Sequence, residues 1–200
     1  TCVDIVCSRN ACVLPYRHKD ASAAAFASAN NAVLASERSG GGLCLSPQSL
    51  LEIEAGTRLV LPSPNGSTLT LACTDPVVLA GCLRNAAAVA DFASRHPGPV
   101  TVVAAGEQWQ DGTLRPAVED LLGAGAVIHH LQGARSPEAS VAEAAFVGAR
   151  SQLSSIIGSC ASGVELVGRG FAADVQLATA LNTSTCVPLL TDGAYVRANG

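Results

Sequence analysis

The sequence contains no methionine, a single tryptophan and few charged side chains. Only 14% of its 200 residues are charged, whereas 48% are hydrophobic. This composition excludes an intrinsically disordered chain and is typical of a globular protein that can bury a sizeable core. Because the chain opens on Thr1 and lacks methionine altogether, we expect an N-terminal segment to be missing.

Runs of basic residues and long apolar runs are absent as well. The formal net charge is −4, so we expect no nucleic-acid partner, since phosphate backbones attract basic surfaces. No apolar stretch reaches the roughly 18 residues that cross a bilayer, and no signal-peptide pattern opens the chain. We therefore expect no membrane partner and a cytoplasmic protein, with a homodimer as the base-rate expectation for oligomeric state.

Eight cysteines are present, but none forms a Cys-x-x-Cys pair and no Cys/His spacing fits zinc. Most lie among alanine, valine and leucine, where cysteine behaves as a small buried hydrophobe. We therefore expect free, mostly buried thiols, as in a reducing compartment. The even spacing of Cys2, Cys7 and Cys12 leaves a redox or metal role as the alternative.

Short apolar runs alternate with helical segments along the chain. Strands are expected at 11–16, 32–35, 58–61, 77–81, 100–106 and 187–190. Helices are expected at 20–30, 46–53, 85–94, around 118–126 and over most of 137–181. This alternation predicts one α/β domain over residues 1–200, with a layered, largely parallel or mixed sheet and helices on both faces. Ligands of such sheets bind beyond the carboxyl ends of the strands.

Several standard motifs of α/β enzymes are missing. There is no Gly-x-Gly-x-x-Gly for a dinucleotide, no Walker loop and no Gly-x-Ser-x-Gly nucleophile elbow. His129 and His130 lack a second histidine at metal-binding spacing, so we interpret them as surface residues at a helix C-terminus. Any reaction must therefore be sought in the polar turns that follow the strands.

The first polar turn contains Asn65, Gly66, Ser67 and Thr68, just after the strand at 58–61. An Asn-Gly pair permits positive φ, so that successive backbone N–H groups can converge on an anion. The two hydroxyls add donors at a possible helix N-terminus. The alternative is an ordinary turn, because Asn-Gly is common in turns.

Two further turns carry charged side chains. Arg84 and Asn85 follow the strand at 77–81, and the planar fork of arginine suits phosphate; the alternative is a surface arginine beside a capping asparagine. Glu107 follows the strand at 100–106, and Glu119 with Asp120 begins the next helix. Carboxylates near a phosphate site commonly hold Mg²⁺, although here they could also face solvent and favour the helix N-terminus.

In this order, the turns resemble the 2-phosphosulfolactate phosphatase family. The matching stretches are 61–67, 81–86, 105–106, 114–126, 162–166 and 170–175. The family usually opens with a strand that ends in an Asp-Val-Leu-Arg-like turn, which the residues after Asp4 do not reproduce. Members of this family are Mg²⁺-dependent phosphatases that convert 2-phospho-3-sulfolactate to 3-sulfolactate and phosphate.

The resemblance implies a small phosphorylated acid as substrate and Mg²⁺ as cofactor. It implies phosphate binding by Asn65, Gly66, Ser67, Thr68 and Asn85, stabilisation of developing charge by Arg84, and a metal-ligand or general-base role for Glu107. A sulfonate would be met by Arg38, Arg115 or Arg169, if any of these is not simply a surface residue. The alternatives are a non-catalytic module that binds a phosphorylated metabolite, or a structural domain that keeps only the fold.

Glu119 and Asp120 are the implied metal ligands. Consecutive helical residues lie about 100° apart around the helix axis, so both carboxylates are not expected to reach the same ion. We expect Glu119 to bind the metal and Asp120 to hydrogen-bond a neighbouring turn.

Overall fold

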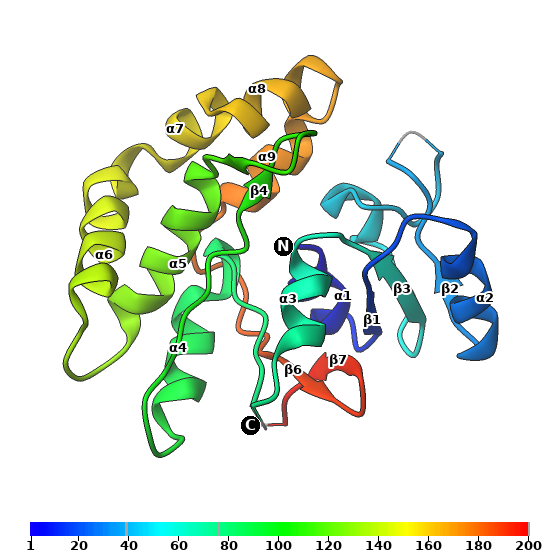
Figure 1. Cartoon of the computed structure of the whole chain (residues 1–200), viewed down its shortest axis with the longest axis horizontal. Coiled ribbons are helices and arrows are strands. Elements are labelled where there is room, and N and C mark those ends of the chain that lie inside the picture. Colours follow the sequence, from blue (N-terminus) through cyan, green and yellow to red (C-terminus); the bar gives the residue numbers. More distant parts are fainter. Residues whose placement is uncertain (39, 76, 200) are drawn as a thin grey trace. The chain divides into compact units, whose positions relative to one another are not determined.

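The computed structural model describes residues 1–38, 40–75 and 77–199 (Figure 1). Its contacts divide the chain into two compact units. The first unit comprises Thr1–Ala80 and Cys186–Gly200, and the second comprises Gly81–Thr185. Each unit is described by itself, and the single domain expected over residues 1–200 stays a prediction.

The first unit is built on a mixed five-stranded sheet. Its elements are α1 (Cys2–Ser8), β1 (Cys12–Tyr16), α2 (Ala21–Ala29), β2 (Val33–Leu34), the 3-10 helix η1 (Pro47–Leu50), β3 (Arg58–Pro62), α3 (Gly66–Ala72), β6 (Pro188–Thr191) and β7 (Ala194–Arg197). The strand order is β2-β3-β1-β7-β6. β3 pairs in parallel with β1 and β2, whereas β7 is antiparallel to β1 and β6, which confirms the predicted mixed sheet.

Strand residues of this sheet alternate between two apolar clusters, as a pleated strand requires. Val13 and Leu59 pack in a cluster with buried residues of α1 and η1. Leu14 and Val60, the next residue along each strand, pack instead with residues of α2. Helices therefore cover both faces of the sheet, as the sequence predicts.

The second unit is mainly helical. Its elements are η2 (Leu83–Asn85), α4 (Ala86–Ser94), β4 (Glu107–Gln108), β5 (Leu114–Arg115), α5 (Val118–His130), α6 (Pro137–Ala149), η3 (Arg150–Gln152), α7 (Leu153–Ser159), α8 (Ala161–Gly168) and α9 (Ala172–Thr179). β4 and β5 form an antiparallel hairpin, and the helices from α6 to α9 confirm the helical character predicted for 137–181. In the described parts of the chain, no helix is both long and apolar enough to cross a bilayer.

Helices α5 and α6 approach closely enough for their backbones to touch. A Cβ placed on Gly125 of α5 would lie 2.1 Å from the carbonyl oxygen of Ala142 of α6. That separation is far inside van der Waals contact, so only glycine allows this packing. Phe146 of the same helix is fully buried and would also be struck.

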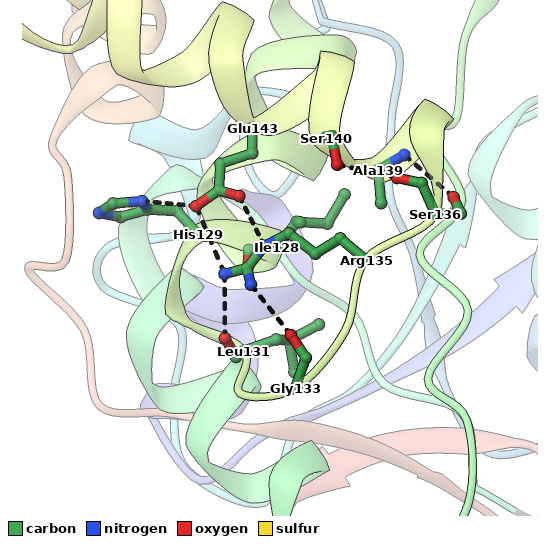
Figure 2. Close-up of polar contacts among 9 residues, drawn as sticks. All are labelled: Ile128, His129, Leu131, Gly133, Arg135, Ser136, Ala139, Ser140 and Glu143. Carbon is green, nitrogen blue, oxygen red and sulfur yellow. Dashed lines mark hydrogen bonds and ion pairs between the residues drawn. The ribbon is translucent and has the colours of Figure 1, made fainter.

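An arginine closes the C-terminal end of α5 (Figure 2). Arg135, in the loop before α6, donates to the carbonyl oxygens of Ile128 and Leu131, each at 3.2 Å. Its Nε also forms an ion pair with Glu143 of α6 at 2.5 Å. The Glu143 carboxylate lies 3.1 Å from Nδ1 of His129, so this histidine is a partly buried member of a helix-joining network and not an isolated surface residue.

Two of the predicted strands are wrong. Residues 100–106 form no strand in the described structure, and the side chains of Val100 and Val103 are 44% and 63% exposed. Their β-branched residues favour extended backbone, but no described strand pairs with them. Within 77–81 only Leu79 forms a bridge, an isolated antiparallel one to Leu189.

The cysteines lie less deeply than predicted. Each of the eight, all in the described ranges, has a free thiol. Cys7, Cys44 and Cys186 are buried, four more are partly buried, and Cys73 is exposed. Burial raises the pKa of the Cys7 thiol far above its usual range, so this residue is an inert part of the core.

Candidate active site

The predicted site residues divide between the two units. The segment Asn65–Thr68 lies in the first unit, whereas Arg84, Asn85, Glu107, Glu119 and Asp120 lie in the second. Each group is therefore described inside its own unit.

The Asn-Gly pair of the first unit begins a helix instead of forming a left-handed turn. Asn65 has φ −83° and ψ −68°, and Gly66 is the first residue of α3, without positive φ. A Cβ on Gly66 would make only ordinary contact with Ser63 Oγ at 3.6 Å. The expectation of positive φ is therefore wrong, because helical backbone already starts at this pair.

Ser67 is buried, and its polar groups serve the fold. Its hydroxyl accepts from the N–H of Tyr16 at 3.1 Å and lies 3.4 Å from the carbonyl oxygen of Leu61, to which it donates. Its own N–H donates to the carbonyl oxygen of Ser63 at 3.1 Å. These bonds tie α3 to β1 and β3, so Ser67 has no donor to spare. Phosphate binding by Asn65, Gly66 and Thr68 stays a prediction.

Asn85, in the second unit, also has a structural role in this geometry. Its side chain is fully buried, and its Oδ1 accepts from the N–H of Cys82 at 2.8 Å. This contact closes the turn that leads into α4, and although Asn85 occupies the N-cap position of α4, its side chain makes no capping bond to that helix. A side chain with no exposed surface cannot meet a phosphate in this conformation.

Arg84 is held against the end of α9. Its Nη1 lies 3.5 Å from the carbonyl oxygen of Leu177, and its own carbonyl oxygen accepts from the N–H of Ser184 at 2.9 Å. The residue as a whole is partly exposed. Binding of phosphate by Arg84 stays a prediction.

The structure brings three carboxylates together at the start of α5. Asp120 accepts a hydrogen bond through Oδ2 from the N–H of Gly106 at 2.9 Å. Gly106 has φ +72°, a conformation that favours glycine and aims this N–H at α5. Asp120 therefore bonds a neighbouring turn, as expected, which leaves Glu119 as the carboxylate available for another partner.

Three carboxylates come from residues at this contact, since Glu119 precedes Asp120 and Glu107 follows Gly106 in the sequence. Burial and the negative charges of Glu119 and Glu107 together raise the pKa of Asp120 to about 6, against the opposing effect of the hydrogen bond from Gly106. Oε2 of Glu119 accepts a weak hydrogen bond from the Cys160 thiol at 3.5 Å. This cluster is called the acidic group below.

The acidic group has the right donor chemistry for Mg²⁺, which prefers oxygen ligands. In the described ranges no group of three or more histidine, cysteine, aspartate or glutamate side chains is arranged to hold a metal ion. Mg²⁺ usually takes only one or two carboxylates and completes its shell with water and phosphate oxygens. Magnesium binding by these carboxylates stays a prediction.

Comparison with known proteins decides the family. The family model described as 2-phosphosulpholactate phosphatase matches residues 8–193. This chain belongs to the 2-phosphosulfolactate phosphatase family. The match runs through both units and includes every predicted site residue.

Relatives bear the same family name. The chain is 34% identical over 167 residues to the 2-phosphosulfolactate phosphatase of Methanothermobacter thermautotrophicus, covering 80% of this chain and 70% of the relative. It is 39% identical over 87 residues to a probable 2-phosphosulfolactate phosphatase of Thermosynechococcus vestitus, covering 43% and 34%. It is 32% identical over 135 residues to a probable 2-phosphosulfolactate phosphatase of Gloeobacter violaceus, covering 67% and 56%. The aligned regions thus span from about a third to 70% of these relatives.

The sequence of this 2-phosphosulfolactate phosphatase family member offered three arginines that could bind a sulfonate. The structure distinguishes one of them, Arg115, by its contacts. Arg115 of β5 is the cross-strand partner of Glu107 in β4. Its guanidinium carbon lies 4.9 Å from the centre of the Trp109 ring, and its Nη2 lies 2.9 Å from Oε1 of Glu165. The only sequence signal for Arg115 was its place in the family-like stretch 114–126.

Proposed function

We propose that this chain hydrolyses the phosphate monoester of a small acid, 2-phospho-3-sulfolactate, in a Mg²⁺-dependent reaction that releases 3-sulfolactate and phosphate. The observation that carries the proposal is the family match over residues 8–193, together with relatives named for this activity. The acidic group supports it independently, because its charges repel one another and would be neutralised by a cation.

The roles of the second unit's residues follow from their geometry. Glu119 is the proposed metal ligand, because Asp120 is engaged by Gly106. Asp120 orients the first turn of α5, and Glu107 serves as a further ligand or as the general base that takes a proton from the attacking water. The guanidinium of Arg84 stabilises negative charge that develops on the phosphoryl oxygens. The chemistry that Mg²⁺ supplies when bound is neutralisation of phosphate oxygens and orientation of a water molecule.

The test is phosphate release from 2-phospho-3-sulfolactate, measured with Mg²⁺, with excess chelator, and again after Mg²⁺ is restored. We expect release only in the first and third conditions. A protein that binds the substrate but releases no phosphate in any condition would instead be a binding module for phosphorylated metabolites. Absence of both release and ligand-dependent thermal stabilisation would leave only the structural role.

Two further expectations remain proposals. A cytoplasmic location is consistent with eight free thiols, and fractionation of the native cell would test it. A homodimer is proposed on base rates, and the molar mass in solution would test it.

A further inference from the structure

Arg115 uses only part of its hydrogen-bonding capacity. Its side chain is 12% exposed, and its Nη2 donates to a single oxygen of Glu165 at 2.9 Å. Its Nε is fully buried and has no acceptor among the described residues. Burying a donor without an acceptor costs free energy. An additional oxygen atom that accepts a hydrogen bond from Nε would remove this cost.

The two nitrogens concerned lie on one edge of the guanidinium. Nε and Nη2 present their N–H bonds side by side, in the fixed fork that matches the two oxygens of an oxyanion. Glu165 satisfies one half of this edge and leaves the other half without a partner. Two oxygens of one ligand group could satisfy both halves together.

The surroundings keep this edge in place. The ring of Trp109, itself 48% exposed, lies against the guanidinium plane at 4.9 Å. Stacking of this kind fixes the orientation of the guanidinium plane and partly shields it from water. Arg115 is also paired across the hairpin with Glu107, whose charge reaches Asp120. The edge thus belongs to the same hairpin as one member of the acidic group.

Glu165 behaves as a replaceable partner. Its side chain is 59% exposed and contacts Arg115 through one oxygen only. The Glu165 end of this ion pair already faces water, so its carboxylate regains hydration when another anion takes its place at Arg115.

We infer that the Nε–Nη2 edge of Arg115 binds the acid group of the substrate that is not phosphorylated, a sulfonate or carboxylate, and that this group displaces Glu165. The inference rests on the proposed function, because it takes from there a substrate with a second acid group. Arg115 then determines specificity: it selects phosphate esters that carry another anion.

The experiment compares binding of 3-sulfolactate by calorimetry in the wild type, Arg115→Lys, Glu165→Gln and Arg95→Gln. Arg95 is the matched control, an exposed arginine of the second unit that forms an ion pair with Asp91. Arg115→Lys keeps the charge but loses the bidentate edge, so we expect affinity to fall about tenfold. Glu165→Gln removes the competing charge, so we expect affinity to rise, while Arg95→Gln leaves it unchanged.

The affinity for 3-sulfolactate is expected to fall in Arg115→Lys and to rise in Glu165→Gln. These opposite changes distinguish ligand binding by Arg115 from a purely structural ion pair with Glu165. If Glu165→Gln weakens binding as Arg115→Lys does, or if the wild type does not bind 3-sulfolactate, the inference is overturned. Lactate, which has the carboxylate alone, serves as a second titrant. Loss of affinity for lactate in Arg115→Lys assigns the edge to the carboxylate, and loss confined to 3-sulfolactate assigns it to the sulfonate.

Kinetics separate this inference from the proposed function. For 2-phospho-3-sulfolactate, Arg115→Lys should raise KM with little change in kcat, whereas p-nitrophenyl phosphate, which lacks a second acid group, should show no change. If Arg115→Lys left KM unchanged for both esters, the proposed binding role of Arg115 would be rejected, while the proposed phosphatase activity would stand. A wild type without phosphatase activity would reject the proposed function. The changes in affinity for 3-sulfolactate measured by calorimetry would still decide the role of Arg115.

Discussion

The start of α3 and the start of α5 look alike in the sequence but differ in how their polar groups are satisfied. In both places polar residues follow a predicted strand. At α3, Ser67 is buried and uses both its hydroxyl and its N–H within the sheet unit. At α5, burial and the negative charges of Glu119 and Glu107 raise the pKa of Asp120. Polar residues at a strand end therefore indicate a site only where the fold leaves their charge uncompensated.

The largest effect expected from this comparison is on stability at α3. Ser67→Ala leaves the partly buried N–H of Tyr16 without its acceptor, so we expect the free energy of unfolding to fall by about 1–3 kcal/mol. Urea denaturation would measure it, with Thr68→Ala, at the exposed neighbouring position, as control. Equal stability of the two variants would mean that Ser67 does not secure α3.

A smaller effect is expected on catalysis at α5. Glu119→Gln keeps the shape and removes the charge, so Mg²⁺-dependent phosphate release should fall at least about tenfold, or roughly 1.4 kcal/mol in the barrier. Glu138→Gln is the control, since Glu138 lies in the first turn of α6 and is exposed.

Stability should change little in either glutamine variant. Full activity and unchanged Mg²⁺ dependence in Glu119→Gln would remove this residue from the site. If Asp120→Asn behaved in the same way, the acidic group would be an ordinary helix N-terminus.

The smallest effect distinguishes a helix start from a left-handed turn. Gly66 is helical and has room for a methyl group, so Gly66→Ala should raise the free energy of unfolding by about 0.5 kcal/mol through a better helix propensity. Gly106→Ala is the comparison, because φ is +72° there and alanine would be strained. Destabilisation by Gly66→Ala would restore the left-handed interpretation.

The sequence predicted those parts of the fold that depend on local pattern. The strands β1, β3 and β6 are short apolar runs packed in a sheet, and α2 begins at Asp20, whose side chain accepts from the N–H of Ser22. The segment 100–106 has the same apolar character, yet no described strand pairs with it. Strand formation needs a partner, and nothing local in the sequence specifies one.

The candidate site was predictable to the same degree. Helical spacing correctly predicted that Asp120 bonds a neighbouring turn, because it depends on geometry within one helix, whereas the metal-ligand role of Glu119 stays a prediction. The structural role of Ser67 could not be predicted, since it depends on Tyr16, which is 51 residues away in the sequence. The unused edge of Arg115 likewise appears only when Glu165 is placed beside it.

The contact at Gly125 has a consequence for how the acidic group is aimed. Glu119 lies six residues before Gly125 on α5, which is about 9 Å along the helix axis. Because the Ala142 carbonyl of α6 lies against Gly125, any side chain at this position would push α5 away from α6. The placement of Glu119 relative to α6 thus depends on a backbone contact fewer than two turns away. Aim of the proposed metal ligand would then depend on a position that carries no side chain at all.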